Sequence, residues 1–283
     1  MATIYNQATL TYSGGTVSSN VTSGELLEVL TVTKTAVVDE YTQGSDVTYA
    51  VNIMNSGSAA YTGLTLTDDL GAYQFGETTL QPMDYVAGSV KYFVDGVLQT
   101  APTVTVGPPL VISGISVPAG STATVLYTAN ANDYAPMSVG GSITNTVTVG
   151  GNGVSDITAS ATVTAASNPV LEIEKSMSPT SVAENGTITY TFVISNTGNA
   201  EAEATDDVVV TDTFSPVLSD ITVTYNGEPW ATPANYSYDE TSGVFSTVSG
   251  AITVPAATYT QDPATGMWAS EPGTATLTVT GTI

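Results

Sequence analysis

The chain has 283 residues, which is enough for two domains of ordinary size, each with its own core. Lys and Arg together number 3 against 26 Asp and Glu, so the formal net charge is −23. Nucleic acids and anionic membranes are therefore disfavoured as partners, because contacts with phosphate need basic side chains. Cys and His are both absent. This excludes disulfides and thiolate metal sites, removes the usual general base, and leads us to expect no cofactor and no metal site.

The first 24 residues predict a hairpin. A strand is expected over residues 4–10, followed by a turn at Ser13-Gly14-Gly15 and a second strand near residues 16–22. This segment resembles the end of a domain more than the beginning of one.

The rest of the chain consists of short alternating runs of Val, Thr, Ile and Tyr separated by Gly, Asn, Asp and Pro, as in residues 47–53 and 188–194. Alternation with period two is typical of half-buried strands. Asp95-Gly96 and Asn226-Gly227 are hairpin-turn signals, because both residues of each pair tolerate positive φ. The sequence therefore predicts an all-β protein.

Two internal copies become visible when the tyrosines are aligned. Lys34 lies fifteen residues before Tyr49, and Lys175 lies fifteen residues before Tyr190. Further landmarks recur in the same order: Asn55-Ser56-Gly57 with Asn196-Thr197-Gly198, Thr67-Asp68 with Thr211-Asp212, and residues 115–119 with 252–256. We expect a donor hairpin over residues 1–24, a first domain over 25–167 and a second over 168–283.

The second copy stops early relative to the first. Residues 274–283 match residues 122–131, after which the first copy continues through residues 143–149 and a further strand ending near Thr164. The N-terminal hairpin matches this continuation. The pattern predicts that the second domain is completed by the hairpin of a neighbouring subunit, which gives a head-to-tail homopolymer.

The ordered landmarks resemble the conserved-repeat domain of unknown function that occurs in tandem along bacterial surface proteins. Its usual features are an opening Thr-Lys strand, a Gly-x-x-Val-x-Tyr strand, an Asn-x-Gly turn, a Thr-Asp strand end and a closing Ile-x-Asn strand. The resemblance implies two immunoglobulin-like β-sandwich domains in tandem.

Lys34 and Lys175 occupy equivalent positions, and strand alternation predicts that both face inward with Val32 and Ile173. Burial without full compensation favours the neutral amine, which is a nucleophile. The chain also resembles the isopeptide-forming immunoglobulin-like domains of pilins and adhesins, in which a first-strand Lys attacks a last-strand Asn beside a buried carboxyl group.

This second resemblance implies Lys34, Asp68 and Asn145 as a cross-linking site in the first domain, with Asp68 as the catalyst. In the second domain it implies Lys175 and the catalyst Asp212, with no closing Asn. The missing Asn is expected to be Asn6 of the neighbouring subunit.

Simpler interpretations remain open. Each lysine can form an ion pair with its Asp, and Asn6 and Asn145 can be ordinary turn or edge residues. The acids at positions 69, 206 and 207 can be solvated or hold Ca²⁺, although they lack the spacing of a dedicated calcium loop.

The sequence as a whole favours a structural subunit of an extracellular fibre on a cell or spore surface. The alternative is a stalk, adhesin or carbohydrate-binding module of a surface protein. An enzyme with turnover is not expected, because His and Cys are absent and no paired-carboxylate cleft is predicted.

Overall fold

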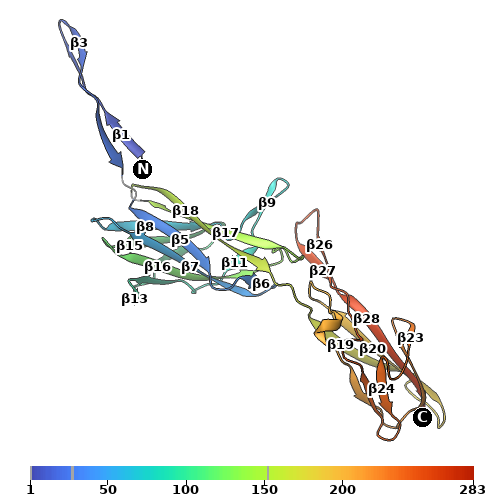
Figure 1. The fold of residues 1–283 in the computed structure, drawn as a ribbon. Coiled ribbons are helices and arrows are strands. Elements are labelled where there is room, and N and C mark those ends of the chain that lie inside the picture. Colours follow the sequence, from blue (N-terminus) through green and yellow to red (C-terminus); the bar gives the residue numbers. More distant parts are fainter. Residues whose placement is uncertain (1, 27–28, 152) are drawn as a thin grey trace.

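The computed structural model describes residues 2–26, 29–151 and 153–283. It is an all-β protein in which two immunoglobulin-like sandwiches follow one another and an N-terminal hairpin projects from the first (Figure 1). Over these residues the one helical element is a 3₁₀ turn, η1 (Ala204–Asp206), so no described helix is long and apolar enough to cross a membrane. The predicted fold class is confirmed.

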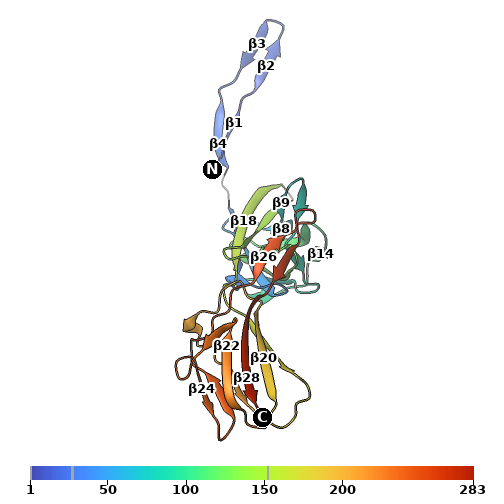
Figure 2. The same ribbon diagram turned by 90° about the vertical axis from the view of Figure 1, so that its right-hand side faces the viewer.

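The N-terminal hairpin is a two-part antiparallel ribbon. β1 (Ala2–Asn6) pairs with β4 (Thr22–Leu26), and β2 (Thr9–Tyr12) pairs with β3 (Gly15–Ser18). The last strand of the hairpin, β4, thus ends at Leu26, two residues beyond the expected end of the hairpin at residue 24. Both views place the ribbon at the end of the molecule opposite the C-terminus (Figures 1 and 2).

The first sandwich consists of two six-stranded sheets. One has the order β13-β12-β16-β7-β5 with β11 also on β16, and the other has the order β14-β15-β8-β17-β18-β6. The strands of the first sheet are β5 (Leu30–Ala36), β7 (Asp46–Asn55), β11 (Met83–Tyr85), β12 (Lys91–Val94), β13 (Val97–Leu98) and β16 (Thr122–Ala131). Those of the second are β6 (Glu40–Tyr41), β8 (Tyr61–Asp68), β14 (Thr103–Thr105), β15 (Leu110–Val117), β17 (Ser142–Gly151) and β18 (Val154–Ala165), with a small ribbon of β9 (Tyr73–Phe75) and β10 (Thr78–Leu80) beside them.

Alternation along the strands produces the core between these sheets. In β16 every second residue is buried, while the intervening residues, three of them threonines, are partly exposed. β17 follows the same rule, with Ile143, Asn145, Val147 and Val149 facing inward.

The second sandwich repeats the first sheet but has a smaller partner. Its larger sheet has the order β19-β20-β28-β22-β23, and its smaller sheet has the order β21-β25-β24. The strands are β19 (Leu171–Ser178), β20 (Thr187–Asn196), β21 (Thr211–Thr213), β22 (Ser219–Tyr225), β23 (Glu228–Trp230), β24 (Tyr236–Asp239), β25 (Val244–Thr247) and β28 (Gly273–Thr282).

Some matching landmarks differ in structure. Thr67-Asp68 ends the long strand β8, whereas Thr211-Asp212 begins the three-residue strand β21. Residues 115–117 lie in β15, but of residues 252–254 only Val254 forms a bridge, with Ala202. β8 has a paired strand on each side, β15 and β17, whereas β21 pairs only with β25 among the described residues.

The Asn-x-Gly landmark is a buried turn anchor. The Asn55 amide donates to the carbonyls of Ala59, Val117 and Pro118, and its Oδ1 accepts from the Gly57 N–H. Asn196 makes the equivalent set of bonds in the second domain. Asparagine is needed here because a single side chain must supply both donors and an acceptor inside the protein.

A hairpin inserted in the second domain joins the two sandwiches. β26 (Thr258–Gln261) and β27 (Trp268–Glu271) lie against the first domain. There the backbone N–H of Trp268 donates to the Asp133 carbonyl at 2.8 Å. The Gln261 side chain donates to the Tyr73 hydroxyl at 2.9 Å. With the short joint at residues 166–170, these bonds fix the two domains end to end (Figure 2).

Candidate cross-linking sites

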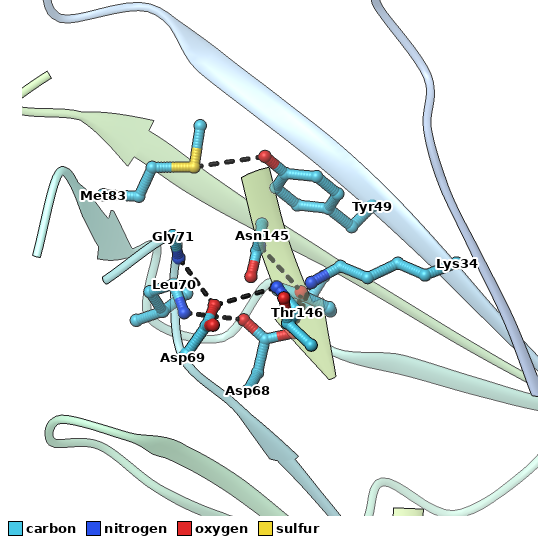
Figure 3. A network of polar contacts seen from close by, with 10 residues as sticks. Lys34, Tyr49, Asp68, Asp69, Leu70, Gly71, Met83, Asn145 and Thr146 are labelled. Carbon is cyan, nitrogen blue, oxygen red and sulfur yellow. Dashed lines mark hydrogen bonds and ion pairs between the residues drawn. The ribbon is translucent and has the colours of Figure 1, made fainter. Parts of the chain in front are cut away.

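Lys34 lies on the inner face of β5 and is almost completely buried. Its relative exposure is 6%, and it points into the space between the two sheets (Figure 3). Burial lowers the pKa of Lys34 below its ordinary value, and the neighbouring Asp68 opposes this effect only in part. The side chain is therefore nearer to the neutral amine than a surface lysine is.

Asp68 faces Lys34 from the end of β8 in the opposite sheet. Its Oδ2 lies 2.6 Å from Lys34 Nζ, and neither side chain is accessible to solvent. The other oxygen, Oδ1, accepts the Leu70 N–H at 3.0 Å, which fixes the carboxyl group. A buried pair of this kind costs desolvation free energy, so it is weak evidence for a purely stabilising role.

Asn145 completes the group from β17, the strand next to β8. It is fully buried, and its Nδ2 donates to the Tyr127 hydroxyl at 3.2 Å. Its Oδ1 has no hydrogen-bond partner among the described residues. Leaving a buried carbonyl oxygen unpaired costs about 1–3 kcal/mol, so this atom is an open acceptor beside the Lys34–Asp68 pair.

Tyr127 belongs to the same cluster and was missed in the sequence analysis. Its hydroxyl donates to Asp68 Oδ2 at 2.5 Å, and its ring stacks on Tyr49 with centroids 5.5 Å apart. Burial, with the nearby Asp68 charge, raises the pKa of Tyr127 well above its ordinary range, which keeps the phenol protonated. Strand alternation alone could have placed the Tyr127 side chain inward, since it shares the buried face of β16 with Val125 and Ala129.

The second domain brings Lys175 and Asp212 together in the same way. Lys175 Nζ forms a close ion pair with Asp212 Oδ2. The ammonium group also lies over the rings of Tyr190, Phe192 and Phe214, at 4.8, 5.4 and 5.5 Å from their centroids. Here, however, the Lys175 side chain is 40% exposed.

The exposure arises because the inner face of β19 is uncovered. Leu171 and Ile173 are 36% and 57% exposed, whereas Leu30 at the equivalent position of β5 is 6% exposed. In the first domain β18 lies beside β5 and covers it. Within residues 2–26, 29–151 and 153–283, no strand takes that position next to β19, and none pairs with the free edge of β21.

No Asn joins the second site within the described part of the subunit. Asn6, the expected partner, lies on the N-terminal hairpin and is exposed. Val279 occupies the position of Tyr127, because Val279 pairs with Tyr190 as Tyr127 pairs with Tyr49. The second site thus has an amine and a carboxyl group, but no amide among the described residues and no phenol at the position of Tyr127.

The first site contains what amide exchange requires. An amine of lowered pKa, a carboxyl group and a primary amide converge in the buried space between the sheets, which is the arrangement needed for nucleophilic attack on an amide with acid–base assistance. Asp69, beside the site, accepts the backbone N–H groups of Gly71 and Thr146 at 2.8 Å in both cases (Figure 3), and its charge also raises the pKa of Lys34.

No protein-family model matches the sequence, and no curated protein matches it either. Similar solved structures include the pilus backbone of Streptococcus pneumoniae, at 13% identity and TM-score 0.34, covering 86% of this chain and 55% of that one. The major pilin subunit of Bacillus cereus is similar at 11% identity and TM-score 0.35, over 96% of this chain and 73% of that one. A collagen-binding domain from a Staphylococcus aureus adhesin covers 49% of this chain and 99% of its own, at 12% identity and TM-score 0.31.

Proposed function

We propose that the protein is the structural subunit of an extracellular fibre, on a cell or spore surface, assembled head to tail by donation of the N-terminal hairpin. The observation that carries this proposal is a matched pair of surfaces at opposite ends of the molecule. One end presents an unpacked hairpin, and the other belongs to the sandwich in which β19 is uncovered and β21 has a free edge.

The first domain supplies the template for the joint. There β17 pairs with β8 so that Val147 lies opposite Asp68, two residues after Asn145. With β1 and β2 in the place of β17, and Asn6 in the place of Asn145, Ala8 lies opposite Asp212. β3 and β4 then take the place of β18 and cover β19.

The hairpin has the side chains for this position. In a continuous donor strand, residues 6, 8 and 10 would share the inward face. Leu10 and Val17, opposite each other in the ribbon, are 64% and 52% exposed. Burial of each such side chain contributes about 1.5–3 kcal/mol. Pairing with β21 also satisfies a free strand edge, which otherwise invites unspecific association.

Isopeptide bonds are the second part of the proposal. Lys34 and Asn145 form one within the subunit with Asp68 as the acid–base catalyst, and Lys175 and Asn6 form another between subunits with Asp212 in that role. This is a single-turnover reaction of the protein with itself and not an enzymatic activity. A stalk or adhesin module of a surface protein is the alternative. That alternative gives no role to the projecting N-terminal hairpin.

Electron microscopy of the purified full-length protein tests the assembly. We expect unbranched filaments whose axial repeat contains two domains, because each joint consumes one hairpin and one open sandwich. Dispersed two-domain particles at every protein concentration would contradict the proposal.

The intramolecular bond has its own test. A chymotryptic digest should contain a branched peptide joining the Lys34 and Asn145 segments, about 17 Da lighter than their sum because ammonia leaves. Asp68→Asn should abolish it, since the amide cannot take up a proton from Lys34. The control Asp69→Asn should retain it, because an Asn oxygen can accept the same backbone N–H groups and loss of the Asp69 charge lowers the pKa of Lys34 further toward the neutral amine. Recovery of both linear peptides in full yield from the wild-type protein would show that the bond does not form.

A further inference from the structure

A continuous chain of hydrogen bonds joins the attacking nitrogen of the first site to the leaving nitrogen. Lys34 Nζ donates to Asp68 Oδ2 at 2.6 Å, Tyr127 donates to the same oxygen at 2.5 Å, and Asn145 Nδ2 donates to the Tyr127 hydroxyl at 3.2 Å. We infer that Tyr127 is a catalytic residue that relays a proton from Asp68 to the departing ammonia. The inference rests on the proposed cross-link and adds a residue to its mechanism.

The proton balance of amide exchange requires such a path. The Lys34 ammonium first passes a proton to Asp68, and the neutral amine attacks Asn145 Cγ to form the new C–N bond. The leaving NH₂ group must gain a proton before the Cγ–Nδ2 bond breaks, and it takes the phenol proton while Asp68 passes its own proton to Tyr127. The carboxylate restored in this way accepts the second proton of the attacking nitrogen. Protonated Asp68 and Tyr127 lie between these two nitrogens. The sum is one ammonium, one carboxylate and one primary amide giving one secondary amide, one ammonia and a protonated Asp68.

The relay follows from the geometry of the amide. In the ground state Nδ2 donates to Tyr127, because the nitrogen of a planar amide has no free lone pair. After attack this nitrogen becomes tetrahedral and can accept the phenol proton across the same contact, while Asp68 returns a proton to the phenol oxygen. The same contact turns Asn145 so that Oδ1 is left without a partner, ready to accept a proton or hydrogen bond as negative charge develops.

The environment of Tyr127 suits a relay better than a permanent base. Burial raises its pKa, so the phenol holds its proton until a stronger base, the leaving nitrogen, lies beside it. Val279 occupies this position in the second domain. A bond between Lys175 and Asn6 therefore cannot use a phenol at that position.

Tyr127→Phe tests the relay, because it removes one oxygen and keeps the ring stacked on Tyr49. We expect the full-length variant to fold, to be recovered partly unreacted, and to lose ammonia at least about 100-fold more slowly than the wild-type chain, the usual contribution of a general acid–base group. Mass spectrometry of chains pulse-labelled during cell-free synthesis measures both rates. Tyr92→Phe is the matched control, since it removes another buried hydroxyl, one bonded to the Ser116 carbonyl, and should react at the wild-type rate.

A fluorinated tyrosine at position 127 supplies a second measurement that does not depend on how Tyr127→Phe folds. It keeps the hydroxyl but makes the phenol more acidic, so we expect the rate and its pH profile to change, with no change for the same substitution at position 92. Wild-type rates in both Tyr127 variants, with a wild-type protein that loses its 17 Da as expected, would overturn the relay and leave the cross-link standing. A wild-type protein that loses no ammonia would overturn the cross-link and the relay together.

Discussion

Wild-type fibres are expected to survive boiling in detergent and to migrate as a ladder of multimers, whereas Lys175→Ala and Asn6→Ala fibres should give monomers. In the proposed joint, the docked hairpin brings the Asn6 amide to Lys175 and Asp212, which already form an ion pair within the subunit. Holding reactants in place is equivalent to raising their concentration to roughly 10⁵–10⁸ M, so no external enzyme is required. Denaturing gel electrophoresis measures the outcome.

Two substitutions of the same residue types serve as controls. Lys91 is exposed on β12 and Asn20 is exposed between β3 and β4, and neither is matched to a member of the Lys-Asp-Asn sets. Lys91→Ala and Asn20→Ala should retain the ladder. Complete dissociation of wild-type fibres to monomer would mean that Lys175 and Asp212 are only an ion pair.

Removal of residues 1–26, which form β1 to β4, should abolish filaments and leave a soluble two-domain particle. The truncated chain keeps the open sandwich but has no donor, so it can accept one neighbour and cannot extend the fibre. Electron microscopy checks the loss, and size-exclusion chromatography with light scattering checks that the particle is monomeric.

The same truncated chain should act as a chain terminator. Added to assembling wild-type protein in substoichiometric amounts, it should shorten the fibres in proportion to its share, because each truncated subunit ends one chain. A truncated chain carrying Lys175→Ala should still terminate fibres, but the terminal link should dissociate in detergent. Filaments of normal length formed by the truncated chain alone would show that another segment makes the joint.

The fold could be predicted largely from local pattern. Period-two alternation identified the strands, and Asp95-Gly96 and Asn226-Gly227 do form hairpin turns with positive φ at all four residues. The short length of the strand that contains Thr211-Asp212 could not be predicted in the same way. Its strand is short because a sheet neighbour is lacking, and that depends on long-range pairing rather than on local sequence.

Residues of the candidate site could be predicted where the two domains carry the same residue type at matching positions, and could not be predicted where the residue types differ. Lys34, Asp68 and Asn145 could be proposed because the chain resembles isopeptide-forming domains and because Lys175, Asp212 and Asn6 occupy matching positions. Tyr127 was missed because its counterpart is Val279, so the comparison of copies gave no signal. The burial of Lys34 and the exposure of Lys175 likewise could not be told apart, since both strands have the same alternation and differ only in what covers them.

The most direct test of hairpin donation is a cryo-electron microscopy structure of the assembled fibre. We expect β1 and β2 of one subunit to pair antiparallel with β21 of the next, with Ala8 opposite Asp212, the Asn6 side chain joined to Lys175, and β3 and β4 over β19. A fibre in which the edge of β21 is unpaired, or is paired with a segment other than residues 1–26 of a neighbour, would contradict the account.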